Sequence, residues 1–166
     1  MPLFPTRNDL VKLAMVAIMT LPVMAESVDA KPKVTVSNKT FTVDATTIDG
    51  LLTQLHQKGP KGYWAYTDWY VKWTGSCETS VAITYTLPKH KNVDKLDPTV
   101  RKKWLGMIDA LTKHEQKHGQ NAISAAQEIE KTKCANGNAV IKKWNKADID
   151  LDKRTDHGKK EGVVLK

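Results

Sequence analysis

The sequence is poor in cysteine and in long apolar runs, and we find no internal repeat and no low-complexity segment in it. Its 166 residues include two cysteines, so at most one intramolecular disulfide can form. The longest apolar run, residues 13–24, is shorter than the stretch of about 20 residues that spans a bilayer. The length suits one domain better than two. These absences exclude a disulfide-rich scaffold, a polytopic membrane protein and a repeat array.

The N-terminal segment has the order of features found in secretory signal peptides. Positive charge at Arg7 and Lys12 precedes the apolar run 13–24, and the small residue Ala25 follows it. We therefore predict a signal peptide that is cut after Ala25, with Ala30 as the alternative site. An N-terminal membrane anchor that is never cleaved is the other interpretation. Cleavage would leave no stable membrane anchor and would place the protein in the periplasm or outside the cell.

Removal of residues 1–25 would leave a single basic domain, residues 26–166. The whole chain has a formal net charge of +8; the predicted signal peptide carries Arg7, Lys12 and Asp9, so the domain would carry +7. The lysines are scattered and form no block, which is typical of solvated surfaces. Export also argues against a nucleic-acid partner, and we expect none.

The first half of the domain is predicted to contain strands and one helix. Alternating apolar and polar residues over 33–43 indicate two short strands or a hairpin. Helical spacing of apolar residues, with Thr47 as the N-cap and Gly59-Pro60 as the stop, predicts a helix between them. Aromatic and β-branched residues predict two long strands within 62–75 and 77–88.

Two helices are predicted to follow. Asp97 and Pro98 supply an N-cap and a proline at the first helical position of a long helix. Its pattern breaks near residues 134–138, and a second amphipathic helix then ends near Gly158. Residues 162–166 are predicted to form a last short strand. The order indicates an α+β fold in which antiparallel strands pack on the long helix and the C-terminal helix.

The stretch LTKHEQKHGQ, residues 111–120, carries the strongest chemical signal. At 100° per residue, His114, Glu115 and His118 fall on the apolar stripe of the long helix, together with Trp104 and Leu111. Ionisable groups on a buried stripe are costly unless they are paired or bind a metal. Histidines that were merely exposed would lie with the lysines on the opposite face. The HExxH pattern therefore favours a metal site over a chance match.

Zinc is the metal that this pattern suits. Two imidazoles one helical turn apart can reach the same ion, and catalytic zinc takes three protein ligands. Glu115 can then act as general base. We assign the third ligand to His157, at the end of the second helix and 39 residues beyond His118. Its alternatives are Asp156, Asp152 and Glu161. A helix-capping role for His157 is the other interpretation.

The remaining histidines and the aromatic strand receive less specific interpretations. We expect His56 and His90 to be exposed, and we assign them no role. Strand alternation places two sets of side chains on opposite faces: one is Tyr66, Asp68 and Tyr70, and the other is Trp69, Val71 and Trp73. Packing in a small core is the expected use. An edge strand here could also bind an extended peptide.

Cys77 and Cys134 form an isolated pair in a chain that we expect to be exported. Such a pair usually forms a disulfide in an oxidising compartment. Two free thiols, or thiolate ligands of zinc, are the alternatives, and export argues against both.

Several segments together carry a resemblance to a known family. They are TDWYVKW, Cys77, VAITYTLP, Trp104, HEQKH, Cys134, DKRTDHG and EGVVL. In these features the sequence resembles a family of bacterial predicted secreted zinc-dependent proteases that is also described as a domain of unknown function. The resemblance implies a zincin-like domain with His114 and His118 as zinc ligands and Glu115 as catalytic base. It also favours His157 as the third ligand and a disulfide between Cys77 and Cys134.

The sequence thus predicts an exported zinc metalloprotease that hydrolyses peptide bonds with a zinc-activated water. Proteins, short peptides and the peptide cross-links of peptidoglycan are all candidate substrates. Two alternatives differ in class. One is a non-catalytic zinc-binding envelope protein, and the other is a module that binds an envelope polymer through aromatic residues and lysines.

Overall fold

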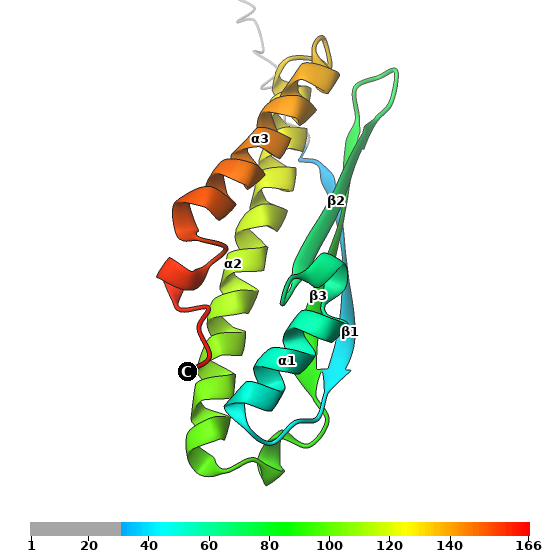
Figure 1. Ribbon diagram of the computed structural model, residues 1–166. Helices are drawn as coiled ribbons and strands as arrows, with labels where there is room; N and C mark the ends of the chain where they lie inside the picture. The colour runs from blue at the N-terminus through cyan, green and yellow to red at the C-terminus, as the bar shows by residue number, and fades with distance from the viewer. Residues whose placement is uncertain (1–30) are drawn as a thin grey trace, which may run out of the picture.

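The computed structural model describes residues 31–166, so the predicted signal peptide and its cleavage after Ala25 or Ala30 lie outside the described residues. The fold is α+β, with a three-stranded sheet and three α-helices (Figure 1). The elements in chain order are β1 (Lys33–Val43), α1 (Ile48–Lys58), β2 (Tyr66–Trp73), β3 (Thr79–His90), α2 (Pro98–Lys131) and α3 (Gly137–Thr155), with short 3₁₀ turns at Pro60–Gly62, Val93–Lys95 and Lys159–Glu161.

The sheet has the order β1-β3-β2. The hairpin of β2 and β3 is antiparallel, as predicted, and Trp73 lies opposite Thr79. Residues 33–43 differ from the prediction, because they form one continuous strand that runs parallel to β3. The polar residues Ser37, Asn38 and Lys39 do not turn the chain, since each of them pairs with a β3 residue. The chain instead leaves β1 through α1 and reaches β3 only after β2, and this long connection allows β1 and β3 to pair in parallel.

The long helix α2 is fixed at its start by the predicted cap. The Asp97 carboxylate accepts hydrogen bonds from the backbone N–H groups of Thr99 and Val100, at 2.8 and 3.3 Å. Helix α2 then runs along the sheet, and α3 folds back against it after a short turn (Figure 1). None of the helices in the described part of the chain is both long and apolar enough to cross a membrane.

Two apolar clusters pack along α2. The first cluster joins α1 and the C-terminal segment to the start of α2; its fully buried members include Leu51, Leu55, Met107 and Leu111. The second cluster lies between the sheet and the later part of α2; it includes Val71, Ile83, Ala122, Ala126 and Ile129. The HExxH residues occupy the stretch of α2 between them.

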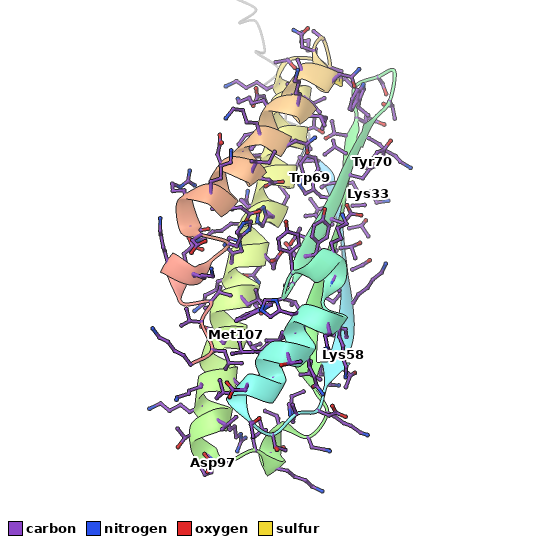
Figure 2. The ribbon with its side chains drawn as sticks, in the orientation of Figure 1. Lys33, Lys58, Trp69, Tyr70, Asp97 and Met107 are labelled. Atoms are coloured by element: carbon purple, nitrogen blue, oxygen red, sulfur yellow. A yellow bond between two sulfur atoms is a disulfide. The ribbon has the colours of Figure 1, made fainter. Side chains whose placement is uncertain are left out.

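Side chains of β2 alternate between the helices and solvent, as predicted. Trp69 points towards the helices and packs against the second cluster, whereas Tyr70 points outward and is 61% exposed (Figure 2). His90 differs from the expectation. It is buried, its Nε2 atom lies 3.0 Å from the Ala45 carbonyl oxygen, and its ring meets the Trp104 ring edge-on. His90 therefore packs against the first cluster through Trp104.

The C-terminal residues do not form the predicted strand. Residues 163–166 have no regular secondary structure. Their alternating pattern has another cause, since Val163 and Leu165 insert into the first cluster while Val164 faces outward. The apolar residues therefore anchor the C-terminal segment to the core without strand pairing.

The disulfide between Cys77 and Cys134 is present, as predicted. It joins the loop between β2 and β3 to the turn between α2 and α3. The bond therefore ties the tip of the hairpin to the tip of the helical pair.

Candidate metal centre

Helix α2 supplies two imidazoles and one carboxylate to a buried polar cluster. His114, Glu115 and His118 are only 3%, 6% and 8% exposed. One helical turn separates the two histidines, and their ring centroids lie 5.1 Å apart with the rings nearly perpendicular. The sequence prediction that all three lie on the buried face of the helix is confirmed.

Helix α3 brings Asp152 against both histidines. One carboxylate oxygen of Asp152, Oδ1, lies 3.1 Å from His114 Nε2 and 3.2 Å from His118 Nε2. Donor atoms of these three residues all lie within 4.8 Å of one another. Among the described residues, these three form a group whose donor atoms are close enough together to hold a metal ion.

The other nitrogen of each imidazole also faces a carboxylate. His114 Nδ1 lies 3.0 Å from Glu161 Oε2, and His118 Nδ1 lies 2.9 Å from Asp148 Oδ1. Lys117 donates to Glu161, while the indole N–H of Trp69 donates to Asp148 at 2.7 Å. These outer contacts fix the orientation of both rings.

The proton inventory of the centre explains why a cation would fit there. A neutral imidazole has one N–H, and the Nδ1 contacts with Asp148 and Glu161 use it in each ring. Both Nε2 lone pairs then point at the Asp152 oxygen. Three lone pairs that meet at one place repel one another unless a proton or a metal ion lies between them.

The pKa shifts follow from the same arrangement. Burial opposes the protonated form of His118, but the hydrogen bond to Asp148 and the nearby carboxylates outweigh it, so the pKa of His118 is raised. Burial would raise the pKa of Asp148, yet hydrogen bonds from His118, Asn121 and Trp69 lower it. The hydrogen bond from Lys117 lowers the pKa of Glu161. The surroundings thus favour ionised carboxylates at Asp148 and Glu161 and positive charge on the His118 imidazole.

The donor set and its spacing match a tetrahedral zinc site. Zinc prefers imidazole nitrogen and carboxylate oxygen at about 2.0–2.2 Å, which places neighbouring ligand atoms about 3.3 Å apart. The Nε2–Oδ1 distances of 3.1 and 3.2 Å agree with that separation. A carboxylate behind each imidazole is the usual outer arrangement for a histidine ligand.

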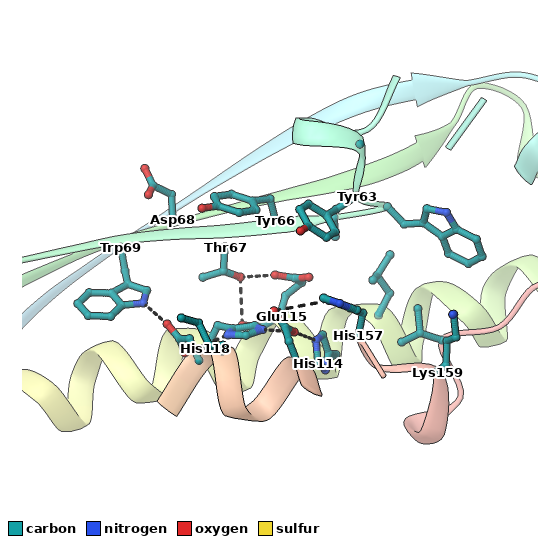
Figure 3. Close-up of a pocket in the computed structure, with 18 of the residues that line it drawn as sticks. Tyr63, Tyr66, Thr67, Asp68, Trp69, His114, Glu115, His118, His157 and Lys159 are labelled. Atoms are coloured by element: carbon teal, nitrogen blue, oxygen red, sulfur yellow. Dashed lines mark hydrogen bonds and ion pairs between the residues drawn. The ribbon is translucent and has the colours of Figure 1, made fainter. Parts of the chain in front are cut away.

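Glu115 is oriented by a hydroxyl group from the sheet. Thr67 Oγ1 donates to Glu115 Oε2 at 2.6 Å and lies 3.1 Å from the Glu115 backbone oxygen (Figure 3). Burial raises the pKa of Glu115, while the Thr67 hydrogen bond and the two histidines oppose that rise. Glu115 is therefore a buried carboxylate with a fixed orientation beside the two imidazoles.

Two glycines allow the chain to pack closely at the centre. A Cβ atom on Gly119 would lie 1.9 Å from the Tyr85 hydroxyl oxygen, so only glycine admits that tyrosine here. Gly158 has a φ of +80°, and a Cβ atom there would meet Val163 at 2.6 Å and His114 at 3.1 Å. Burial and the charge of Glu115 raise the pKa of Tyr85.

A cavity of about 640 Å³ opens onto the centre. It lies between β2 and the α2–α3 pair, and His114, Glu115, His118 and Asp152 line it. Its volume falls in the range of about 300–1,000 Å³ that small-molecule and cofactor sites occupy. The centre can therefore be reached by a ligand of that size.

His157, the predicted third ligand, lies at the edge of the centre. Its Nδ1 atom is 3.7 Å from Asp152 Oδ2, its side chain is 54% exposed, and its ring packs against Tyr63. Of the alternatives, Asp152 contacts both Nε2 atoms and Glu161 contacts His114 Nδ1. Asp156 is the C-cap residue of α3, where its backbone is in the left-handed conformation, and its carboxylate pairs with Lys159. The ligand role of His157 stays a prediction.

Two residues of the centre have no place in the sequence prediction. Asp148 lies four residues before Asp152 on α3, so the two carboxylates repeat the spacing of the two histidines that they face. That four-residue spacing of two aspartates could have pointed to Asp148 from the sequence. Thr67 is a single hydroxyl in an aromatic strand, and such a residue carries no sequence pattern of its own.

Comparison with known proteins gives one match. The sequence profile of a family described as "Bacterial protein of unknown function (DUF922)" matches residues 38–158. The chain belongs to this family. The matched range contains His114, His118, Glu115, the α3 residues Asp148 and Asp152, and the disulfide. No curated protein and no solved structure matches the chain.

Proposed function

We propose that this member of the DUF922 family is a zinc-dependent metallopeptidase. The observation that carries the proposal is the meeting of both Nε2 atoms at Asp152 Oδ1, beside the buried carboxylate of Glu115. In the proposal, His114, His118 and Asp152 hold the zinc ion. His157 is the alternative third ligand. When bound, zinc would polarise a carbonyl and lower the pKa of a water to about 7.

The residues around the ion would then carry out the proton transfers. Glu115 accepts a proton from water at the carboxylate oxygen that Thr67 does not hold, and it returns that proton to the amine that leaves. Thr67 holds the other oxygen, so the carboxylate does not rotate away. Burial supports the exchange because it raises the pKa of Glu115 towards the operating pH.

Substrate and location belong to the same proposal. An amide bond in a protein, a peptide or a peptidoglycan cross-link could enter the cavity, with β2 beside it as an edge strand of the sheet. We propose that the protein works in the periplasm or outside the cell. The disulfide supports this location, because such bonds persist in oxidising compartments.

The test replaces Glu115 and a matched glutamate on the same helix. With zinc loaded, Glu115→Gln should lower kcat/KM on a mixture of internally quenched peptides by about 10³-fold, because a general base contributes about 10²–10⁴-fold. The variant should keep its zinc, measured by elemental analysis. Glu130→Gln, about 22 Å along the helix by the rise of 1.5 Å per residue, should change kcat/KM less than about twofold.

Three results would contradict the proposal. Wild-type activity in Glu115→Gln would remove the general base. Stoichiometric zinc without hydrolysis of any peptide in the mixture would favour a non-catalytic zinc-binding protein. Binding of an envelope polymer that survives both chelation and loss of His114 would favour a polymer-binding module.

A further inference from the structure

One end of the cavity is not used by the chemistry proposed above. Thr67 donates to Glu115, and Trp69 donates to Asp148, which contacts His118, so β2 runs along α2 in the same direction. The residues that lead into β2 therefore lie towards the part of α2 before Glu115. This end of the cavity, which we call the Tyr63 end, is lined by Tyr63, Trp64, Ala65, Leu111 and Val163.

The Tyr63 end has an apolar floor and an aromatic wall. Ala65, Leu111 and Val163 are buried members of the first cluster, yet they line the cavity. Tyr63 is 47% exposed, and its ring lies 5.6 Å from the ring of His157, centroid to centroid (Figure 3). Trp64 is held by its indole N–H, which donates to His56 at 3.4 Å. An exposed aromatic ring above an apolar floor is a surface that can bury an apolar group.

Charge separates the two ends of the cavity. The carboxylate of Asp148, which accepts from Trp69, lies at the other end, whereas Lys159 and His157 line the cavity near Tyr63 (Figure 3). Lys159 is already paired with Asp156, at 3.3 Å. An apolar side chain at the Tyr63 end would therefore displace water without separating an ion pair.

We infer that the Tyr63 end binds the apolar side chain, aromatic or large aliphatic, of the residue that flanks the amide held at the metal centre. This inference rests on the proposed function. Leu111 precedes Glu115 by four residues, about 6 Å along the helix. One residue of an extended peptide spans about 3.3 Å, so a residue next to the amide can reach this floor.

The test measures binding apart from hydrolysis. Two blocked pentapeptides that differ only in a central Phe or Asp are titrated calorimetrically into metal-free wild-type protein. We expect the Phe peptide to bind about tenfold more tightly, which corresponds to about 1.4 kcal/mol. Equal affinities would overturn the inference.

Two variants of Tyr63 test whether the preference for the Phe peptide arises at the Tyr63 end. Tyr63→Ala should reduce the tenfold preference to about twofold, and its extended backbone accepts any residue. Tyr63→Glu should shift the preference to a peptide with a central Lys. Tyr70→Ala, on the outer face of β2 and outside the cavity, should keep the tenfold preference. A full preference in both Tyr63 variants would overturn the assignment to this end.

These measurements distinguish a failure of the apolar-subsite inference from a failure of the proposed function. If zinc-loaded wild type binds the Phe peptide selectively but cleaves no peptide, the hydrolase proposal fails and the apolar subsite stands. If it cleaves Phe and Asp peptides at the same kcat/KM and binds them equally, the hydrolase stands and the subsite fails.

Discussion

Helix α2 presents two glutamates to threonines of the sheet, and the two pairs have different consequences. Thr67 donates to Glu115 at 2.6 Å, and Thr79 donates to Glu130 through its hydroxyl and, at 3.2 Å, through its backbone N–H. Around Glu115 lie two histidines and a cavity. Glu130 lies next to Ile129 in the second cluster, near the disulfide.

The comparison shows that the role of a threonine–glutamate hydrogen bond depends on the groups around it. Both threonines order a carboxylate and tie a strand to α2. Of the two glutamates, only Glu115 lines the cavity and lies beside the cluster of His114, His118 and Asp152. We therefore distinguish a site end of α2, around Glu115, from a disulfide end, around Glu130. The variants below test whether stability and activity separate along the helix in this way.

The largest effect on stability is expected at the disulfide end. Cys77→Ala with Cys134→Ala removes a cross-link between residues 57 apart in sequence. The loop-entropy relation gives a loss of about 4 kcal/mol in the free energy of unfolding. Urea unfolding measures it, and kcat/KM of the folded fraction should stay within about twofold. Loss of activity in the folded fraction would contradict the separation of the two ends.

The largest effect on metal binding is expected at the site end. Asp152→Ala should weaken zinc binding more than about 100-fold, because even an outer partner of a ligand is worth about 10–100-fold. His157→Ala should change zinc affinity less than about threefold, since its side chain is half exposed at the edge of the centre. Competition with a chromophoric chelator measures both. The reverse order of the two variants would establish His157 as the third ligand.

An intermediate effect is expected from the two threonines. Thr67→Val should lower kcat about tenfold, or about 1.4 kcal/mol in the barrier, because Glu115 loses its orienting donor. KM and zinc content should not change, and Thr67→Ser should restore kcat. Thr79→Val should cost about 1–2 kcal/mol in unfolding free energy and leave kcat unchanged. Equal kcat values in Thr67→Val and wild type would show that Thr67 only ties β2 to α2.

The smallest effect concerns acid stability at the disulfide end. The hydrogen bonds from Lys143 and Trp144 lower the pKa of Glu128 below its ordinary value of 4.5. The folded state therefore gains stability that is present above that value and is lost as the pH falls through the lowered pKa. Solvent screening limits the gain to under about 1 kcal/mol. Glu128→Gln should lose less unfolding free energy than wild type between pH 7 and pH 3. An equal loss would contradict this assignment.

The sequence was informative where local rules decide the structure. Asp97 and Pro98 set the start of α2, and helical periodicity placed His114, Glu115 and His118 on its buried face. The disulfide pairing followed because only two cysteines are present. The prediction of two short strands or a hairpin over residues 33–43 was wrong because strand pairing depends on contacts between segments far apart in sequence. The polar centre of β1 resembles a turn, and only its contact with β3 keeps it extended.

The rest of the centre depends on packing between segments far apart in sequence. Asp148 and Asp152 belong to a lysine-rich helix in which acidic residues are usually solvated. Only the packing of α3 on α2 turns them towards the histidines. His157 was predicted from its place at the end of the second helix and from the family resemblance. The helix ends at Thr155, and the backbone at His157 has a positive φ of 49°. That geometry leaves its side chain at the edge of the centre.

The anchoring of the C-terminal segment has a consequence for the lifetime of the centre. Glu161 holds His114 Nδ1, and it is kept there by Val163 and Leu165, which insert into the first cluster. If those two side chains leave the core, His114 loses its outer carboxylate while the rest of the protein is still folded. The durability of the centre is therefore governed by the local opening of a few residues, whose free energy is smaller than that of global unfolding.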